Sequence, residues 1–114
     1  MRRDDLRLRD ILEALDSLPR IIGGRTEAEF LADETLCYAV AQRLTVVGEA
    51  AARLSLEVRQ RFPAVPWADI IAFRNILVHE YFGIYWPIVW LTATVQAPQL
   101  RDQIAEMIRV QFSE

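Results

Sequence analysis

The sequence predicts an all-α protein, an up-and-down bundle of helices, on two observations. Apolar residues recur at steps of three and four along most of the chain, which is the period of one face of an α-helix. No segment alternates apolar and polar residues between turn signals, so the pattern does not favour a strand. A chain of 114 residues has the length of one domain, and we assign residues 1–114 to a single helical domain.

The first expected helix starts near the N-terminus, where Asp4 or Asp5 can cap it. Pro19 is expected to kink or end this helix, because proline has no amide hydrogen for the helical ladder. The pair Gly23-Gly24 then marks a turn. The apolar face of this helix consists of Leu6, Leu8, Ile11, Leu12, Leu15, Leu18 and Ile22.

Two further helix starts carry capping signals. Thr26 and Glu29 have the spacing of a capping box for a short helix. Asp33 can cap a long helix over residues 34–54, whose apolar residues form one stripe. That stripe consists of Leu36, Val40, Leu44, Val47, Ala51 and Leu54.

The second half of the chain also has a helical pattern, interrupted by prolines. A short helix is expected over residues 55–62, and Pro66 suits the first turn of a helix over residues 67–82. Pro87 can open another helix, and Pro98 either restarts or kinks it before the last stretch. Trp86 and Trp90 are four residues apart and could stack on bases, although helix packing is the more common use of this spacing.

Composition restricts the classes of function. A formal net charge of −3 counts against a generic nucleic-acid-binding domain, which usually has a basic excess. Cys37 is the single cysteine, so the chain can form no internal disulfide and no cysteine-based metal site. The N-terminus carries acids, unlike a targeting peptide, and no apolar run reaches the ~20 residues of a membrane span. We therefore predict a cytoplasmic protein without membrane contact, metal or cofactor.

The stretch FRNILVHEYFG, residues 73–83, sets polar side chains into a strongly apolar segment. On one continuous helix the apolar residues of this region would point in nearly every direction, which is typical of a buried helix. Arg74 and Tyr81 would share one face. Asn75 would share another with His79, the single histidine of the chain.

Two interpretations of these polar groups are open from the residues alone. A buried guanidinium without a partner is costly, so Arg74 must meet an acid, a phosphate or water. In the structural interpretation, Arg74 pairs with Glu49 or Glu80, and His79 bonds a backbone carbonyl. In the functional interpretation, the same groups line a cleft that binds RNA or a nucleotide phosphate.

The motif resembles a known family. The spacing of the motif resembles the signature of HEPN domains: four residues separate Arg74 from His79, and one residue separates His79 from Tyr81. The segments LTVVGEAAARLS and PWADIIAFRNILVHEYFGI resemble, in order and spacing, the two signature blocks of the HepT branch. That branch is the toxin-like partner of a minimal nucleotidyltransferase antitoxin. With the first helix and the segment EAEFLADE, the resemblance covers nearly the whole chain.

The resemblance implies a helical bundle of the HEPN type, a homodimer or higher homo-oligomer formed through the motif helices, and metal-independent cleavage of RNA. It implies that Arg74 and His79 are the catalytic pair and that Asn75 supports them. It also implies that the nucleotidyltransferase antitoxin neutralises the toxin by transferring AMP to Tyr81. Glu49 matches an acid of the first block, for which a structural or orienting role is expected.

These residue types suit cleavage of RNA without a metal. The 2′-OH of RNA is the nucleophile, imidazole exchanges protons near neutral pH, and a guanidinium fork can hold two oxygens of the phosphorane. Arg74 and His79 lie ~140° apart around an ideal helix, and a two-fold dimer would explain how both serve one phosphate. The alternative function is a non-catalytic helical adaptor that binds nucleotide or docks a nucleotidyltransferase, which the acidic net charge favours.

Overall fold

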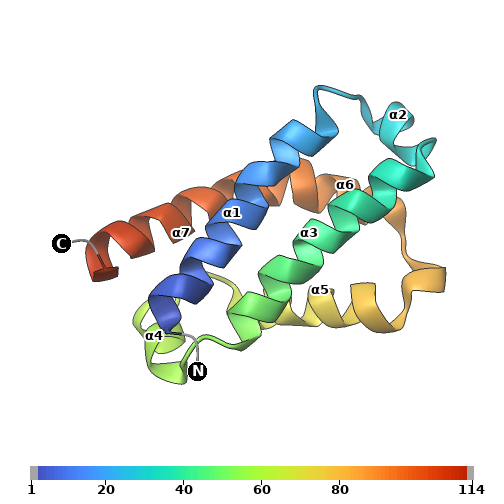
Figure 1. Cartoon of the computed structure of the whole chain (residues 1–114). Coiled ribbons are helices and arrows are strands. Elements are labelled where there is room, and N and C mark those ends of the chain that lie inside the picture. Colours follow the sequence, from blue (N-terminus) through green and yellow to red (C-terminus); the bar gives the residue numbers. More distant parts are fainter. Residues whose placement is uncertain (1–2, 113–114) are drawn as a thin grey trace.

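The computed structural model of the protein describes residues 3–112, with the exception of the side chain of Tyr81. Every regular element in this range is a helix, which confirms the all-α fold. Helices α1 and α3 lie side by side, α7 packs against α1, and α5 lies along α3 at the edge of the bundle (Figure 1). The elements are α1 (Asp4–Ile22), α2 (Glu27–Leu31), α3 (Glu34–Ala52), α4 (Leu56–Arg61), α5 (Trp67–His79), the 3-10 helix η1 (Tyr81–Gly83), α6 (Trp86–Leu91), the π-helical η2 (Thr92–Gln96) and α7 (Ala97–Phe112).

The two ends of α1 differ from the expectation. Arg3 is the N-cap, and Asp4 lies inside the first turn. The Asp4 carboxylate accepts hydrogen bonds from the amide and hydroxyl of Ser55 at 2.9 and 2.7 Å, so it anchors α1 to the start of α4. Pro19 does not end the helix, because its own carbonyl still accepts from the amide of Gly23 at 2.9 Å. Gly23 ends α1 in the left-handed conformation, with φ of 61°.

The predicted caps of α2 and α3 are confirmed. The Thr26 hydroxyl accepts from the amide of Glu29 at 3.2 Å, and the Glu29 carboxylate accepts from the amide of Thr26 at 2.9 Å. The Asp33 carboxylate accepts from the amide of Leu36 at 3.0 Å. Helix α3 ends at Ala52, two residues before the expected end.

The apolar stripe of α3 is buried along its whole length, as the sequence predicts. It packs against buried residues of α1, and α7 contributes Ile104 and Met107 to the same core. Trp86 and Trp90 pack on Phe30, with ring centroids 6.3 and 5.2 Å from it, so helix packing is their use in this structure.

The last helical rod runs from α6 through η2 into α7. Pro87 lies in the first turn of α6, as expected. Pro98 lies in the first turn of α7, and the rod is continuous through the π-helical turn that precedes it. The Thr92 and Thr94 hydroxyls donate to carbonyls one turn back, at 2.8 and 2.7 Å, and so support this turn.

The expectation for α5 is wrong in two respects. The helix ends at His79, and the chain then turns through η1, where the amide of Gly83 donates to the carbonyl of Glu80 at 2.8 Å. The helix is also not buried on all sides. Of its thirteen residues, all of them described, Trp67 and Leu77 alone are buried. Apolar periodicity gives the directions of side chains, but it does not say whether another element of the same chain covers each direction.

The uncovered side of α5 borders a groove of about 620 Å³ between this helix and the α6–α7 rod. Ile70 and Phe73 line it from α5, and Ile88 and Leu91 line it from α6. Ile76 is 44% exposed and continues the apolar surface along α5. Within residues 3–112, no helix is long and apolar enough to cross a membrane.

Candidate functional site

Arg74 lies where α5 crosses α3, and a glycine makes that crossing possible. A Cβ added to Gly48 would lie 2.2 Å from the Cβ of Arg74 and 2.7 Å from its Cγ. No side chain fits there, so Gly48 allows the stem of Arg74 to lie directly on the backbone of α3. The sequence contains a signal for this contact. A glycine inside a helix costs about 1 kcal/mol relative to alanine, so its presence indicates that another element packs closely there.

The head of Arg74 is held by two neighbours. Its Nη2 donates to Oε1 of Glu49 at 3.3 Å, and its Nη1 donates to Oδ1 of Asn75 at 2.9 Å. The side chain of Arg74 is 28% exposed, so the guanidinium remains within reach of solvent. The structure therefore selects Glu49 over Glu80 as the acid that pairs with Arg74.

Glu49 is shared between two arginines. Its Oε1 meets Arg74, and its Oε2 accepts from Nη1 of Arg53, one turn further along α3, at 3.5 Å. The Glu49 carboxylate is 38% exposed, so the two ion pairs contribute little to stability. Their position restricts the direction of the Arg74 guanidinium, and an orienting role for Glu49 stays a prediction.

His79 is the last residue of α5, and it is exposed. Within the described part of the chain, no hydrogen bond or ion pair involves its side chain, so the expected bond to a backbone carbonyl is absent. No bond links it to Arg74 either. Arg74 faces α3, whereas His79 faces solvent beside the turn of η1. One chain thus presents the two motif residues at separate positions on one helix.

Tyr81 is the first residue of η1, and Glu80 separates it from the end of α5. Its side chain is outside the described part of the structure, so its role as a modification target stays a prediction. The backbone of η1 places residue 81 beyond the end of α5, at the same end of the helix as His79.

Other chemistry-bearing residues lie away from this site. Burial raises the pKa of the Cys37 thiol, and the thiol donates to the carbonyl of Phe30 at 3.2 Å, which is a structural contact. Among the described residues, no three His, Cys, Asp or Glu side chains are grouped to hold a metal ion. The larger groove beside α5 is lined by neither Arg74 nor His79.

Comparison with known proteins places this helical bundle in a defined class. The sequence model of the family described as Ribonuclease HepT-like matches residues 11–107, and the chain belongs to this family of HEPN ribonucleases. The match includes both α3, with Gly48 and Glu49, and α5, with Arg74 and His79.

Individual relatives agree with this membership. A protein of Methanocaldococcus jannaschii named as a candidate RNase is 34% identical over 111 residues, which cover 96% of this chain and 92% of that protein. A candidate RNase of Caldanaerobacter subterraneus is 33% identical over 102 residues, covering 90% of this chain and 91% of its own length. A protein of Thermococcus cleftensis named as a probable ribonuclease HepT is 27% identical over 100 residues, covering 88% and 91%. No solved structure matches the chain significantly.

Proposed function

We propose that this ribonuclease is the toxin of a two-component toxin–antitoxin system and that it cleaves RNA without a metal ion, using Arg74 and His79. The observation that carries the proposal is the arrangement on α5. Gly48, Glu49 and Asn75 fix the arginine, and the single histidine stands in solvent with no bond to the described residues. An exposed imidazole is accessible to a bound substrate and can exchange protons with it near neutral pH.

The site would be completed by a second copy of the chain. Arg74 and His79 diverge on α5, and the same helix leaves Ile76 44% and Val78 38% exposed. Apolar groups on a motif helix favour burial against a partner, because removing apolar surface from water stabilises by about 25 cal/mol per Å². A two-fold axis beside α5 would bring two copies of each motif residue around one cleft, as a homodimer or within a higher homo-oligomer.

In such a cleft the cleavage reaction has a balanced set of proton transfers. One His79 imidazole takes the proton of the 2′-OH, and the 2′-oxygen attacks the phosphorus. The Arg74 guanidinium holds the phosphorane oxygens as their negative charge increases. The second imidazole, protonated, gives its proton to the departing 5′-oxygen. The products are a 2′,3′-cyclic phosphate and a 5′-hydroxyl end.

The antitoxin would neutralise the toxin at the end of α5. A nucleotidyltransferase antitoxin would transfer AMP to the hydroxyl of Tyr81, releasing pyrophosphate if ATP is the donor. The added phosphate would bring negative charge near the motif, where it would compete with the RNA phosphate for Arg74.

The test is cleavage of RNA by purified protein in the presence of a chelator. We expect wild-type protein to release fragments with cyclic phosphate ends, and His79→Ala to lose at least ~10²-fold in rate, since proton transfer contributes ~10²–10⁴-fold. Because His79 is exposed, the variant should keep the melting temperature of the wild type. Equal cleavage by the variant at equal soluble concentration would remove His79 from the mechanism.

One observation favours the adaptor as a second candidate. The Glu49 carboxylate already neutralises Arg74, and the chain is acidic overall. An adaptor would bind nucleotide or the nucleotidyltransferase and leave RNA intact. The cleavage assay separates the two functions, since the adaptor predicts no His79-dependent fragments at any enzyme concentration.

A further inference from the structure

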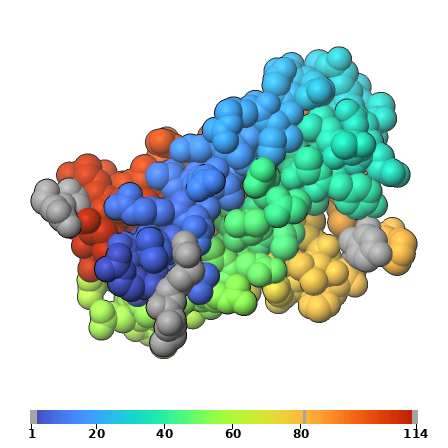
Figure 2. Space-filling view, in the orientation of Figure 1, coloured from blue at the N-terminus to red at the C-terminus, as the bar shows by residue number. Residues whose placement is uncertain are grey.

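A second cleft lies next to the Arg74 site, on the other side of α3. It has a volume of about 260 Å³ and lies between α1 and α3. In the space-filling view, the surface of α3 lies between those of α1 and α5, so the cleft and the motif helix belong to one face (Figure 2). The cleft is lined by Arg7, Asp10, Glu13, Ala14, Arg43, Val46, Glu49, Ala50 and Arg53.

Glu49 joins this cleft to the motif. The residue lines the cleft, and its two carboxylate oxygens meet Arg53 at 3.5 Å and Arg74 at 3.3 Å. A carboxylate between two guanidiniums occupies a position that suits a phosphate group, because the guanidinium fork accepts either anion. Arg53 is therefore a second cation, beside Arg74, that could contact the same RNA strand.

Two further arginines of the cleft lack an acidic partner. Within the described residues, no hydrogen bond or ion pair involves the side chains of Arg7 and Arg43. Arg43 is exposed and Arg7 is half-buried, so their guanidinium groups are within reach of a bound phosphate.

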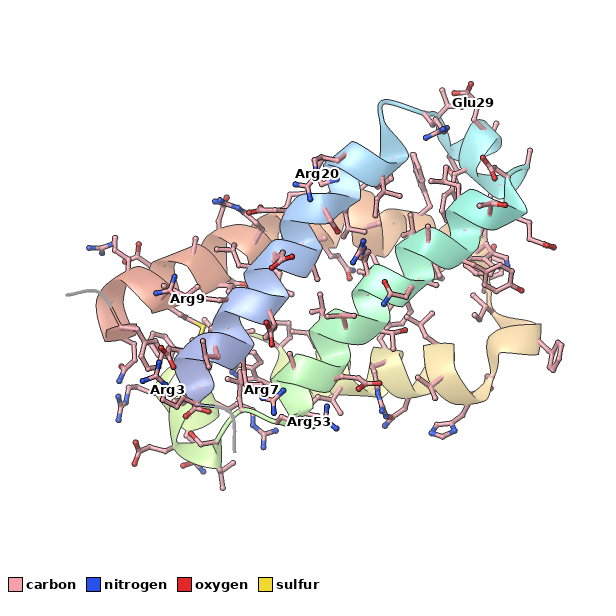
Figure 3. The ribbon with its side chains drawn as sticks, in the orientation of Figure 1. Arg3, Arg7, Arg9, Arg20, Glu29 and Arg53 are labelled. Carbon is pink, nitrogen blue, oxygen red and sulfur yellow. The ribbon has the colours of Figure 1, made fainter. Side chains whose placement is uncertain are left out.

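Two arginines of the cleft lie at one end of the bundle. Figure 3 shows Arg7 and Arg53 at the end of the bundle where α1 begins and α3 ends, with Arg3 close by and Arg20 at the far end of α1. Asp10 and Glu13 also line the cleft, so it has no diffuse positive field. It instead suits a phosphate that direct guanidinium contacts hold in place.

We propose that Arg7, Arg43 and Arg53 form an accessory phosphate site, which holds the RNA backbone next to the phosphate at Arg74. The inference rests on the proposed ribonuclease function and specifies how its substrate is bound. The ligand is the phosphodiester backbone of an RNA strand that crosses α3 from the motif towards α1. Arg7 and Arg43 contact neither Arg74 nor Glu49 and act on binding alone, so their loss raises KM and leaves kcat unchanged.

The experiment measures binding of a single-stranded oligoribonucleotide that carries a 2′-O-methyl group at every position and cannot be cleaved. Arg43→Gln and Arg53→Gln are compared with Arg20→Gln, which makes the same change of charge far from the cleft. We expect Kd to rise about three- to tenfold for the two cleft variants, with a salt slope smaller by ~0.7 for each lost phosphate contact. Arg20→Gln should bind as the wild type does.

The outcomes separate this inference from the proposed function. If wild-type protein cleaves RNA through His79 and both cleft variants match Arg20→Gln in Kd and KM, the accessory site is overturned and the ribonuclease function stands. If the probe binds through the cleft but RNA is never cut, the proposed function fails alone. If wild-type protein does not bind the probe, the accessory site is overturned as well. Arg53 is 60% exposed, so its replacement should leave the fold intact, which melting curves will verify.

Discussion

Helices α3 and α5 cross at Gly48, and they use their apolar residues in opposite ways. The predicted apolar stripe of α3 is buried in the core, and Tyr38 is the large apolar side chain that α3 leaves exposed among its described residues. The apolar residues of α5 surround the helix, and the chain covers only one side, where Trp67 and Leu77 lie. Of these two helices, the one that the chain covers less is therefore the one that carries Arg74 and His79.

An apolar helix therefore need not belong to the core of its own chain. The exposed apolar residues of α5 and the bordering groove leave a surface suited to a partner, and the polar motif residues interrupt that surface. We interpret α3 as a helix of the structural core and α5 as the helix that contacts partners and substrate. Substitutions on each of the two helices test this assignment.

Arg74→Lys should lose about 10²–10³-fold in the rate of RNA cleavage, by analogy with the removal of one donor to a developing oxyanion. Lysine keeps the positive charge but has no planar fork that can hold two phosphate oxygens. The measurement is kcat/KM on a defined oligoribonucleotide, with Arg101→Lys on α7 as a control of the same chemistry. A cleavage rate for Arg74→Lys close to that of the wild type would show that Arg74 serves only in a structural ion pair with Glu49.

Ile76→Asp should weaken self-association by about 10²-fold or more, because a two-fold contact would bury two like charges without partners. Sedimentation at several protein concentrations would measure the change, and cleavage should fall in parallel. Leu56→Asp is the matched control, since Leu56 is 61% exposed on α4, away from the motif. If Ile76→Asp and Leu56→Asp associate equally, the exposed side of α5 is not the contact between copies.

Gly48→Ala should destabilise the protein by about 1–3 kcal/mol, the usual range for overpacking. The sign is diagnostic, because alanine in place of glycine inside a free helix stabilises by about 1 kcal/mol. Here the new Cβ would lie 2.2 Å from the Cβ of Arg74, so α5 must move away from α3. The measurement is urea unfolding, with Gly83→Ala as control, since a Cβ there meets nothing within 4 Å. A stabilised Gly48→Ala variant would show that the crossing is loose.

The same two helices show what the sequence could and could not predict. The Asp33 cap and the stripe of α3 depend on residues near one another in the chain, and both were predicted correctly. The contact of Gly48 with Arg74 joins residues 26 positions apart, and helical periodicity carries no information about it. The early end of α5 was missed because Glu80, Tyr81 and Phe82 are compatible with a helix, and the 3-10 turn before Gly83 competes with it.

The family resemblance predicted four residues of the site: Arg74, His79, Asn75 and Glu49. In the structure, Arg74, Asn75 and Glu49 form one hydrogen-bonded group, and His79 lies outside it. His79 stands apart because the geometry of one helix separates it from Arg74. Whether a second copy supplies the missing neighbour is a property of the assembly, which neither the residue pattern nor one chain contains.

Tyr81→Phe should have the smallest effect on the isolated protein, within about twofold in cleavage rate, because the phenolic oxygen has no part in the proposed proton transfers. Its effect should appear only with the antitoxin. Co-expression with a nucleotidyltransferase encoded beside the gene should add the mass of AMP to the wild-type chain and to Tyr85→Phe, a control for the exposed Tyr85. Tyr81→Phe should gain no mass and should stay toxic in the presence of the partner. A Phe variant that the partner still neutralises fully would mean that the antitoxin acts by binding, and the end of α5 would then be a docking surface and not a site of modification.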